Sequence, residues 1–152
     1  MTTTEAPQIV RADLAHLNDL APLLDAYRVF YRQHSDVEAA RAFLSERLEK
    51  AESVIFLAFL RGRPVGFAQL YPSFSSVSLR RLWILNDLFV APEGRRSGVG
   101  ASLLERARQH GEETNAVRLT LRTAVDNTAA QALYEANGWR RDGEFYSYDL
   151  WL

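Results

Sequence analysis

The sequence feature that most constrains the fold is a long apolar segment followed at once by a glycine-rich turn and a helical pattern. Residues 79–90 are apolar and rich in β-forming side chains, which predicts a strand that is long for its type. Pro92 and Gly94 end this strand, because neither residue suits a strand interior. A helical pattern begins at Ser102, so the turn 95–100 connects the end of a strand to the start of a helix.

This turn carries the features of an anion-binding site. The first backbone N–H groups of a helix have no acceptor within the helix, and the positive end of the helix dipole points the same way. Gly98 and Gly100 lack Cβ atoms and let the backbone approach a bulky anion, while Arg95 and Arg96 add positive charge. The pattern favours a pyrophosphate cradle. The alternative is a tight connection without a ligand, and the sequence is neither a Walker loop nor a complete dinucleotide fingerprint.

Two ordered motifs together resemble the GNAT acetyltransferase superfamily. Residues 95–100 read Arg-x-x-Gly-x-Gly after a hydrophobic strand, which is similar to the acyl-CoA-binding signature of the family. Residues 127–139 read Asn-x-x-Ala-x-x-Leu-Tyr-x-x-x-Gly-Trp, which resembles the downstream helix motif of the same family at the expected separation. The resemblance extends, more weakly, over nearly the whole chain. Residues 84–90 are similar to strands of the branch that modifies histones, polyamines and free amino acids.

The resemblance implies a single α/β (α+β) domain with a mixed, mostly antiparallel central sheet of six to seven strands and about four helices. The sheet is expected to splay at the acyl-CoA site. A length of 152 residues suits one domain with a substantial core, which we place at 9–152 after a disordered tail at 1–8. Strand patterns cover residues 9–11, 54–60, 65–71, 79–90, 117–123 and 145–152.

Local signals predict where the first two helices begin. Pro22 would break a helix interior, so the first helix is expected to start shortly before it, with Asn18 or Asp19 as the N-cap. Residues 35–38 read Ser-Asp-Val-Glu, which predicts a capping box for a second helix. The resemblance places the loop 32–36 over the acceptor pocket.

Acyl transfer to an amine needs a base for the amine and an acid for the leaving thiolate. Tyr134 is the candidate acid, because the family motif puts a tyrosine there beside the thioester sulfur, and a phenol with a pKa near ~10 is protonated at neutral pH. From the residues alone a core aromatic is favoured, and the family match reverses this preference. Asn127 is expected to cap the helix that carries Tyr134, and Gly138 to end it.

Asn86 and Asp87 interrupt the otherwise apolar segment. Burying an unsatisfied polar group costs about 1–3 kcal/mol, so each of the two is expected to have a partner or a role. Only one of them would face the acceptor unless a β-bulge intervenes, and the splayed sheet implied by the resemblance favours a bulge. Asp87 is the preferred base, acting directly or through water, with Asn86 as the neighbouring catalytic candidate. The alternative for Asp87 is a structural role in satisfying a loop.

The resemblance also implies which residues bind the co-substrate acetyl-CoA. Backbone groups at the end of the long strand would bind the pantetheine arm, and an exposed N–H would polarise the thioester carbonyl. The cofactor-binding residues predicted in this way are Leu88, Phe89, Val90, Arg95, Arg96, Ser97, Gly98, Val99, Gly100, Ala101, Asn127 and Ala130.

Composition limits which ligands, metals and cellular locations are expected for this protein. A net charge of −1 gives no electrostatic argument for binding nucleic acid or an anionic membrane. The chain has no cysteine, which excludes disulfides and thiol chemistry and argues against zinc, so no metal is expected. No secretory leader or long apolar span is visible, which favours the cytoplasm. His16, His34 and His110 share no motif with a nucleophile and are expected at the surface, with the alternative that His34 lines the mouth of the acceptor site.

The predicted activity is transfer of an acetyl group from acetyl-CoA to a primary amine of a small molecule, by direct attack. The alternatives are acetylation of protein or histone lysines, a catalytically silent acyl-CoA-binding regulatory module, and a nucleotide-phosphate enzyme. Acidic residues near the site would suit a cationic, polyamine-like acceptor, whereas arginines there would hold a carboxylate and favour an amino acid. The acidic residues are Asp36, Glu38 and Asp87, and the arginines are Arg28, Arg32, Arg80 and Arg81.

The last predicted strand, Phe145–Leu152, has one fully apolar face and one mixed face. Aromatic side chains on both faces, together with a position at a sheet edge, favour pairing with a second copy. The sequence therefore predicts a homodimer, and the alternative is an edge that is covered within one chain.

Overall fold

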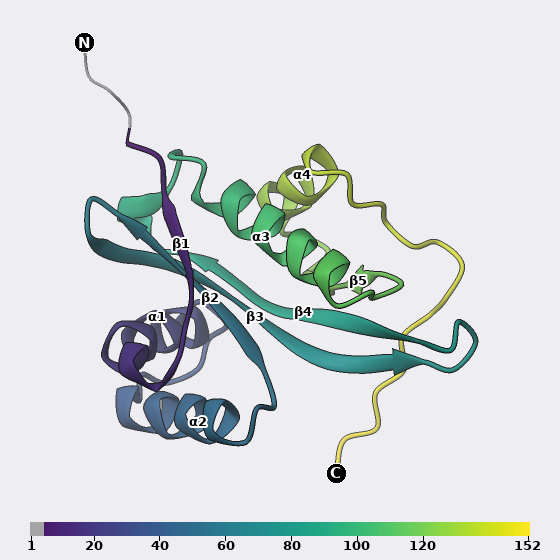
Figure 1. Ribbon diagram of the computed structural model, residues 1–152, viewed down its shortest axis with the longest axis horizontal. Helices are drawn as coiled ribbons and strands as arrows, with labels where there is room; N and C mark the ends of the chain where they lie inside the picture. The colour runs from purple at the N-terminus through teal and green to yellow at the C-terminus, as the bar shows by residue number, and fades with distance from the viewer. Residues whose placement is uncertain (1–4) are drawn as a thin grey trace. The chain divides into compact units, whose positions relative to one another are not determined.

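The computed structural model describes residues 5–152 (Figure 1). Its strands are β1 Gln8–Arg11, β2 Val54–Leu60, β3 Arg63–Ser75, β4 Arg80–Val90 and β5 Leu119–Thr120. Its helices are α1 Leu17–Phe30, α2 Val37–Glu49, α3 Val99–Glu113 and α4 Thr128–Ala136, with 3-10 turns at Leu14–His16 and Pro92–Gly94. The α/β class and the four helices are as predicted. The sheet has five strands within the described residues, fewer than the six to seven expected.

The chain divides into two compact units, one ending at Arg122 and the other running from Thr123 to Leu152. Residues 1–4 of the predicted tail lie outside the described residues, and Gln8, which the sequence analysis placed in that tail, pairs with Phe59 in the sheet. No helix within residues 5–152 is both long and apolar enough to cross a membrane. The cytoplasmic location stays a prediction.

The sheet of the first unit has the strand order β1-β2-β3-β4-β5. The first four strands pair antiparallel, and β5 joins β4 in parallel. Strands β2 and β3 are joined by Arg61 and Gly62, whose φ angles are 52° and 76°. Positive φ at both central residues is typical of a tight two-residue hairpin turn.

The parallel contact between β4 and β5 is short. It consists of Trp83 opposite Leu119 and Ile84 opposite Thr120, although β4 continues to Val90. Beyond Ile84, β4 therefore has no strand neighbour on the β5 side within the described part of the chain. The edge of β4 beyond Ile84 lies where the sheet was expected to splay, and the splay itself stays a prediction.

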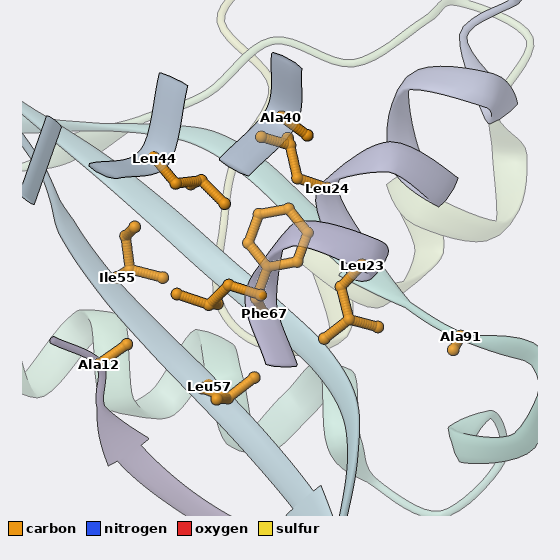
Figure 2. Packing of buried hydrophobic residues seen from close by; sticks show 10 residues of the cluster. Ala12, Leu23, Leu24, Ala40, Leu44, Ile55, Leu57, Phe67 and Ala91 are labelled. Carbon is orange, nitrogen blue, oxygen red and sulfur yellow. The ribbon is translucent and has the colours of Figure 1, made fainter. Parts of the chain in front are cut away.

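Helices cover both faces of this sheet. Figure 2 shows α1 and α2 contributing Leu23, Leu24 and Leu44 around Phe67 of β3, which forms the core of one face. Figure 1 shows α3 on the opposite face. Because side chains alternate along β2, its Phe56 points to that second face and contacts α3.

His110 is buried, which corrects the expectation of a surface histidine. Only 4% of its surface is exposed, and its ring lies 4.6 Å from Trp83 and 5.7 Å from Phe56 between ring centroids. The cause is helical phase, since His110 follows the buried Leu103 and Ala107 along the inner face of α3. Burial lowers the pKa of His110.

The first two helices begin elsewhere than predicted. A 3-10 turn capped by Asp13 leads directly into α1 at Leu17, so neither Asn18 nor Asp19 is the N-cap and Pro22 lies inside the helix. Helix α2 is capped by Asp36, whose side chain accepts from the Ala39 N–H at 3.0 Å. The capping box predicted at residues 35–38 is therefore wrong, because Asp36 is the N-cap and its side chain makes the capping bond.

In the second unit, α4 has both of its predicted ends. The Asn127 side chain accepts a hydrogen bond from the Ala130 N–H at 3.1 Å. At the other end Gly138 has a φ of +88° and donates to the Glu135 carbonyl, while the Trp139 N–H donates to the Tyr134 carbonyl. This pair of bonds is a Schellman C-cap.

The predicted final strand is wrong. Residues 145–152, which we call the C-terminal arm, belong to no strand, and its apolar side chains are 79% to 115% exposed. Strand β5 is likewise shorter than the predicted 117–123. Alternating apolar residues form a strand only where a neighbouring strand supplies backbone hydrogen bonds, and no strand among residues 5–152 pairs with the arm.

Candidate active site and family

The turn between β4 and α3 is tied to the sheet at several points. The Ala91 N–H donates to the Val65 carbonyl at 2.7 Å. Gly94 packs so tightly that a Cβ added to it would lie 2.7 Å from the Val65 Cβ. Arg95 Nε donates to the Val90 carbonyl at 3.2 Å, so Arg95 holds the turn against the end of β4.

Helix α3 begins with backbone donors that have no hydrogen-bond acceptor within the described part of the chain. Its N-cap is Gly98, which has a φ of +75° and no side chain to cap the helix. The Ser102 N–H donates to the Gly98 carbonyl at 3.0 Å. The amides of Val99, Gly100 and Ala101 precede this bond and have no backbone acceptor among residues 5–152. Three such donors at the positive end of a helix suit an anionic ligand.

The side chains of the predicted cradle differ in what they offer. Val99 is 1% exposed, so its side chain belongs to the core and only its amide is available. Arg96 is exposed and has a φ of 62°. The Ser97 hydroxyl donates to the Arg95 carbonyl at 3.4 Å. Of the two predicted cationic side chains, Arg96 is therefore the one that the turn itself does not use.

Strand β4 contains a β-bulge at Asn86, as predicted. Gln69 of β3 lies opposite Asp87, while the next residue, Leu70, lies opposite Leu85, so Asn86 is the extra residue. Asn86 is exposed, whereas Asp87 is 6% exposed. The bulge thus places one polar residue at the surface and its neighbour among buried side chains.

The Asp87 carboxylate is held by neutral donors. Gln69 Nε2 donates to Asp87 Oδ2 at 2.6 Å, and Asn86 Nδ2 donates to Asp87 Oδ1 at 3.0 Å. The Tyr27 hydroxyl donates to the Asn86 carbonyl at 3.4 Å. Burial raises the pKa of Asp87, and hydrogen bonds from Gln69, Asn86 and Tyr27 partly oppose that rise. A carboxyl group with a raised pKa and defined partners is suited to taking up a proton.

Aromatic rings from α1 and the sheet lie on the same face as Asp87. The Tyr27 ring stands edge-on to Phe67 at 6.0 Å and to Phe89 at 6.1 Å, measured between centroids. Burial, and after it the charge of Asp87, raises the pKa of Tyr71 to about 12. Tyr71 therefore stays neutral at physiological pH and brings no charge near Asp87.

The loop between α1 and α2 is fixed by a carboxylate that the sequence analysis missed. Asp25 is 8% exposed and accepts from the Ser35 hydroxyl at 2.7 Å and from the Asp36 N–H at 2.6 Å. Arg28 Nη1 donates to the His34 carbonyl at 3.5 Å. The loop that the resemblance assigned to the acceptor pocket is thus anchored to the inner side of α1.

The arginines proposed as carboxylate ligands are partly engaged elsewhere. Arg80 Nη2 donates to the Asn115 carbonyl at 3.2 Å, and the Arg81 guanidinium lies over the rings of Phe74 and Trp83. These contacts hold both side chains at the start of β4, whereas Asp87 lies near its end. Arg32, in the α1–α2 loop, stays a candidate.

Tyr134 and Asn127 belong to the second unit. Tyr134 is half-buried on α4, and its ring lies 6.1 Å from that of Trp139. Asn127 uses its side-chain oxygen to cap α4, and Ala130 supplies the capped N–H, so both serve the helix in this structure. Their roles toward a ligand stay predictions.

Gln69 is the second polar residue that the sequence analysis missed. A signal was present, since Gln69 is the one strongly polar side chain in the predicted strand 65–71. Its partnership with Asp87 depends on the pairing register of β3 and β4, which no local pattern specifies.

Comparisons with known proteins agree on one family. The model of the Acetyltransferase (GNAT) family matches residues 17–139. The uncharacterized N-acetyltransferase YhfO of Bacillus subtilis is 50% identical over 131 residues, which cover 86% of this chain and 88% of YhfO. A probable acetyltransferase of Haemophilus influenzae is 29% identical over 95% of this chain and 98% of its own length.

Solved structures show the same architecture. The crystal structure of a probable acetyltransferase aligns with a TM-score of 0.91 at 52% identity, covering 95% of this chain and 97% of that chain. The aminoglycoside N-acetyltransferase AAC(6')-Iy, in complex with CoA, aligns with a TM-score of 0.79 at 22% identity over 95% of this chain and 94% of that chain. The second likeness shows the shared fold alone. The family model and the half-identical relative each extend over most of this sequence, and the chain belongs to the GNAT family of acetyltransferases.

Proposed function

We propose that this acetyltransferase moves an acetyl group from acetyl-CoA to the primary amine of a small molecule, an amino acid or a polyamine-like compound. The observation that carries the proposal is the course of β4. After its last pairing with β5 at Ile84, this strand presents the hydrogen-bonded Asp87 and then leads into the cradle at the start of α3. An open strand edge, a buried carboxyl group and an anion-binding turn thus follow one another within one short segment.

In this proposal the pyrophosphate of acetyl-CoA binds the amides of Val99, Gly100 and Ala101, with Arg96 nearby. The pantetheine arm lies along the open edge of β4 at residues 88–90, where an N–H polarises the thioester carbonyl. Asn127 and Ala130 complete the predicted binding residues. Two observations support this assignment: the three amides lack acceptors within the described chain, and the fold is shared with AAC(6')-Iy, which was solved in complex with CoA.

The proposed reaction is a direct displacement. The amine nitrogen attacks the thioester carbonyl carbon, a C–N bond forms and the C–S bond breaks. Asp87 takes the proton from the amine, directly or through water, and the Tyr134 hydroxyl gives a proton to the departing sulfur. Asn86 orients the Asp87 carboxylate through its side-chain amide. The products are the acetylated amine and CoA thiol.

The burial of Asp87 supports a small acceptor. A base that is 6% exposed and bordered by Tyr27 and Phe89 admits a slender primary amine more readily than a bulky one. An amino acid is favoured if Arg32 holds its carboxylate, and a polyamine is favoured if Asp36 and Glu38 hold a second ammonium group.

An acceptor panel tests the proposal. Purified protein is incubated with acetyl-CoA and single amines, including amino acids, polyamines and lysine peptides, and released thiol is measured with a colorimetric reagent. Because the chain has no cysteine, the signal comes from CoA alone. We expect thiol release that depends on a small amine. Binding of CoA without release by any amine would instead identify a silent binding module, and release by lysine peptides alone would identify a protein acetyltransferase.

We also propose that two copies associate through the C-terminal arm. Phe145, Tyr146, Tyr148 and Trp151 are 79%, 90%, 90% and 91% exposed, and so many exposed aromatic side chains in one short segment favour a partner that covers them. Association of two copies would remove these side chains from water and supply the hydrogen-bonding partners of a strand.

Light scattering at micromolar concentration tests this association. We expect a mass near twice the 17.3 kDa of one chain, and a shift toward one chain in Trp151→Asp. A mass near 17.3 kDa for the unaltered protein would rule the dimer out.

A further inference from the structure

Gln69 occupies an unusual position for an amide side chain. It is 0% exposed in the centre of β3, among buried apolar neighbours, and it lies directly opposite Asp87 in the β3–β4 pairing. Its Nε2 donates to Asp87 Oδ2 at 2.6 Å, which is short for a bond from a neutral donor. The proposed displacement uses Asp87 but assigns nothing to Gln69.

The other end of the same amide has no partner. Gln69 Oε1 is buried and accepts no hydrogen bond from any residue between 5 and 152. An amide oxygen buried in this way is unfavourable, because its hydration is lost without compensation. A leucine or methionine in this place would avoid the loss, so the presence of an amide calls for a role in which the oxygen is used.

An amide can serve either protonation state of a carboxyl group. A carboxylate needs a donor, which Nε2 supplies in this structure, whereas a carboxylic acid also needs an acceptor for its own hydrogen. Rotation of the Gln69 amide by half a turn about its last side-chain bond exchanges Nε2 and Oε1. Because Oε1 has no partner to lose, this rotation breaks only the bond to Asp87.

We propose that Gln69 is a positioning residue for the acetyl transfer: it holds Asp87 as a carboxylate through Nε2 before the proton moves, and accepts a hydrogen bond from protonated Asp87 through Oε1 afterwards. The inference rests on the proposed function, in which Asp87 takes the amine proton. Gln69 itself gains and loses no proton, and the hydrogen that Asp87 takes up stays on Asp87 until solvent removes it.

Besides Gln69, the groups that face Asp87 are Tyr27, Tyr71 and Asn86. Tyr27 approaches from α1 and Tyr71 from β3, and Asn86 precedes Asp87 on β4. Arg47 of α2 influences Tyr71 and is absent from the groups that stabilise Asp87. Within the described residues, Asp87 therefore relies on neutral donors, and the bond from Gln69 is shorter than the bond from Asn86.

The test measures the Asp87 carboxyl group itself. The protein, labelled with ¹³C at the aspartate carboxyl carbons, is titrated by NMR as the unaltered chain, as Gln69→Met and as Gln109→Met, and Asp87→Asn assigns the signal. Methionine keeps the length of the side chain and removes both donor and acceptor. Gln109 is exposed on α3 and provides the matched control.

We expect Gln69→Met to raise the Asp87 titration midpoint by about one pH unit. The variant loses the bond from Nε2 to the carboxylate and the bond from the carboxylic acid to Oε1, and the bond to the ionised carboxylate is the stronger of the two. The acidic limb of the kcat profile should move by the same amount, with KM for acetyl-CoA unchanged. Gln109→Met should match the unaltered chain. An unshifted midpoint in folded Gln69→Met would reduce Gln69 to a packing role.

A second measurement needs no variant of Gln69. In the unaltered protein, the ¹⁵N signal of the Gln69 side-chain amide should change with the same midpoint as the Asp87 carboxyl carbon. A Gln69 signal that stays constant through the Asp87 titration would overturn the amide rotation. Both titrations are independent of turnover. If no amine were acetylated, the proposed function would be contradicted, and the two titrations would still test the hydrogen bond between Gln69 and Asp87.

Discussion

Asn86 and Asp87 are neighbours on β4, yet the Asn86 side chain donates to Asp87 Oδ1 at 3.0 Å while one residue is exposed and the other buried. Adjacent residues of a regular strand point to opposite faces and do not meet in this way. The bulge at Asn86 is what permits the contact. Because of the bulge, the Asn86 amide can orient the carboxyl group of Asp87 beside the edge of β4 that has no strand neighbour.

Replacing Asp87 by asparagine should slow turnover and spare the binding of acetyl-CoA. The change keeps the size of the side chain and removes the group that takes the amine proton. We expect kcat to fall about 10²–10⁴-fold, the usual contribution of a general base, at an unchanged Kd for acetyl-CoA. Steady-state kinetics and calorimetry measure the two quantities. An unaltered kcat would assign Asp87 a structural role. Asp13→Asn, at an exposed helix cap, is the control and should leave kcat unchanged.

The same variant should change how stability depends on pH. Burial raises the pKa of Asp87 above that of the unfolded chain, so the folded state binds the Asp87 proton more tightly. This contribution to the free energy of unfolding is complete below the ordinary aspartate pKa of about 3.9 and is lost as the pH rises through the folded-state pKa. Relative to the unaltered protein, Asp87→Asn should therefore gain stability as the pH rises toward 7.

Denaturant unfolding at several pH values measures this difference. A variant that is less stable than the unaltered chain by a margin that grows between pH 4 and pH 7 would show that the hydrogen bonds to the carboxylate outweigh its burial. The pKa of Asp87 would then be lowered.

Gly98 tests the cradle. A Cβ built on Gly98 meets no atom within 4 Å, so a larger side chain would point into the space that the ligand is proposed to occupy. We expect Gly98→Val to abolish binding of CoA. The φ of Gly98 is +75°, so any residue with a Cβ at this position costs about 1–2 kcal/mol in backbone strain. Gly98→Ala is the control, because it carries the same backbone strain without the branched side chain. Calorimetry should find that alanine weakens binding less than valine. Equal affinity of the valine variant and the unaltered chain would remove Gly98 from the site.

Tyr134→Phe removes the proposed proton donor and keeps the ring. We expect kcat to fall about 10–1000-fold with little change in thermal stability or in affinity for CoA. Tyr148→Phe in the C-terminal arm is the matched control and should leave kcat unchanged. If Tyr134→Phe keeps full activity, the hydroxyl serves only the packing of α4.

Local sequence signals predicted the parts of this protein that local physics controls. The long strand before Pro92, a glycine near the start of α3 and the caps of α4 at Asn127 and Gly138 follow from the conformational limits of single residues. Helix α3 itself begins at Val99, earlier than the predicted start at Ser102. The bulge at Asn86 was expected from the family resemblance, whereas the cost of burying polar groups predicted only that Asn86 and Asp87 would each have a partner or a role.

The remaining features depend on contacts between segments far apart in sequence. Asp25 is important because it meets a loop ten residues later, and Gln69 because β3 and β4 pair in one register. His110 could have been placed from the helical phase of α3. The C-terminal arm was predicted as a strand from its alternation alone, although a strand also needs a neighbour.

The placement of acetyl-CoA against β4 and the start of α3 is tested most directly by titrating ¹⁵N-labelled protein with acetyl-CoA and following the backbone amides. We predict saturable shifts that are largest at Val99, Gly100 and Ala101 and continue along residues 88–90 of β4. Saturable binding whose shifts lie elsewhere, or the absence of binding at millimolar acetyl-CoA, would contradict this placement.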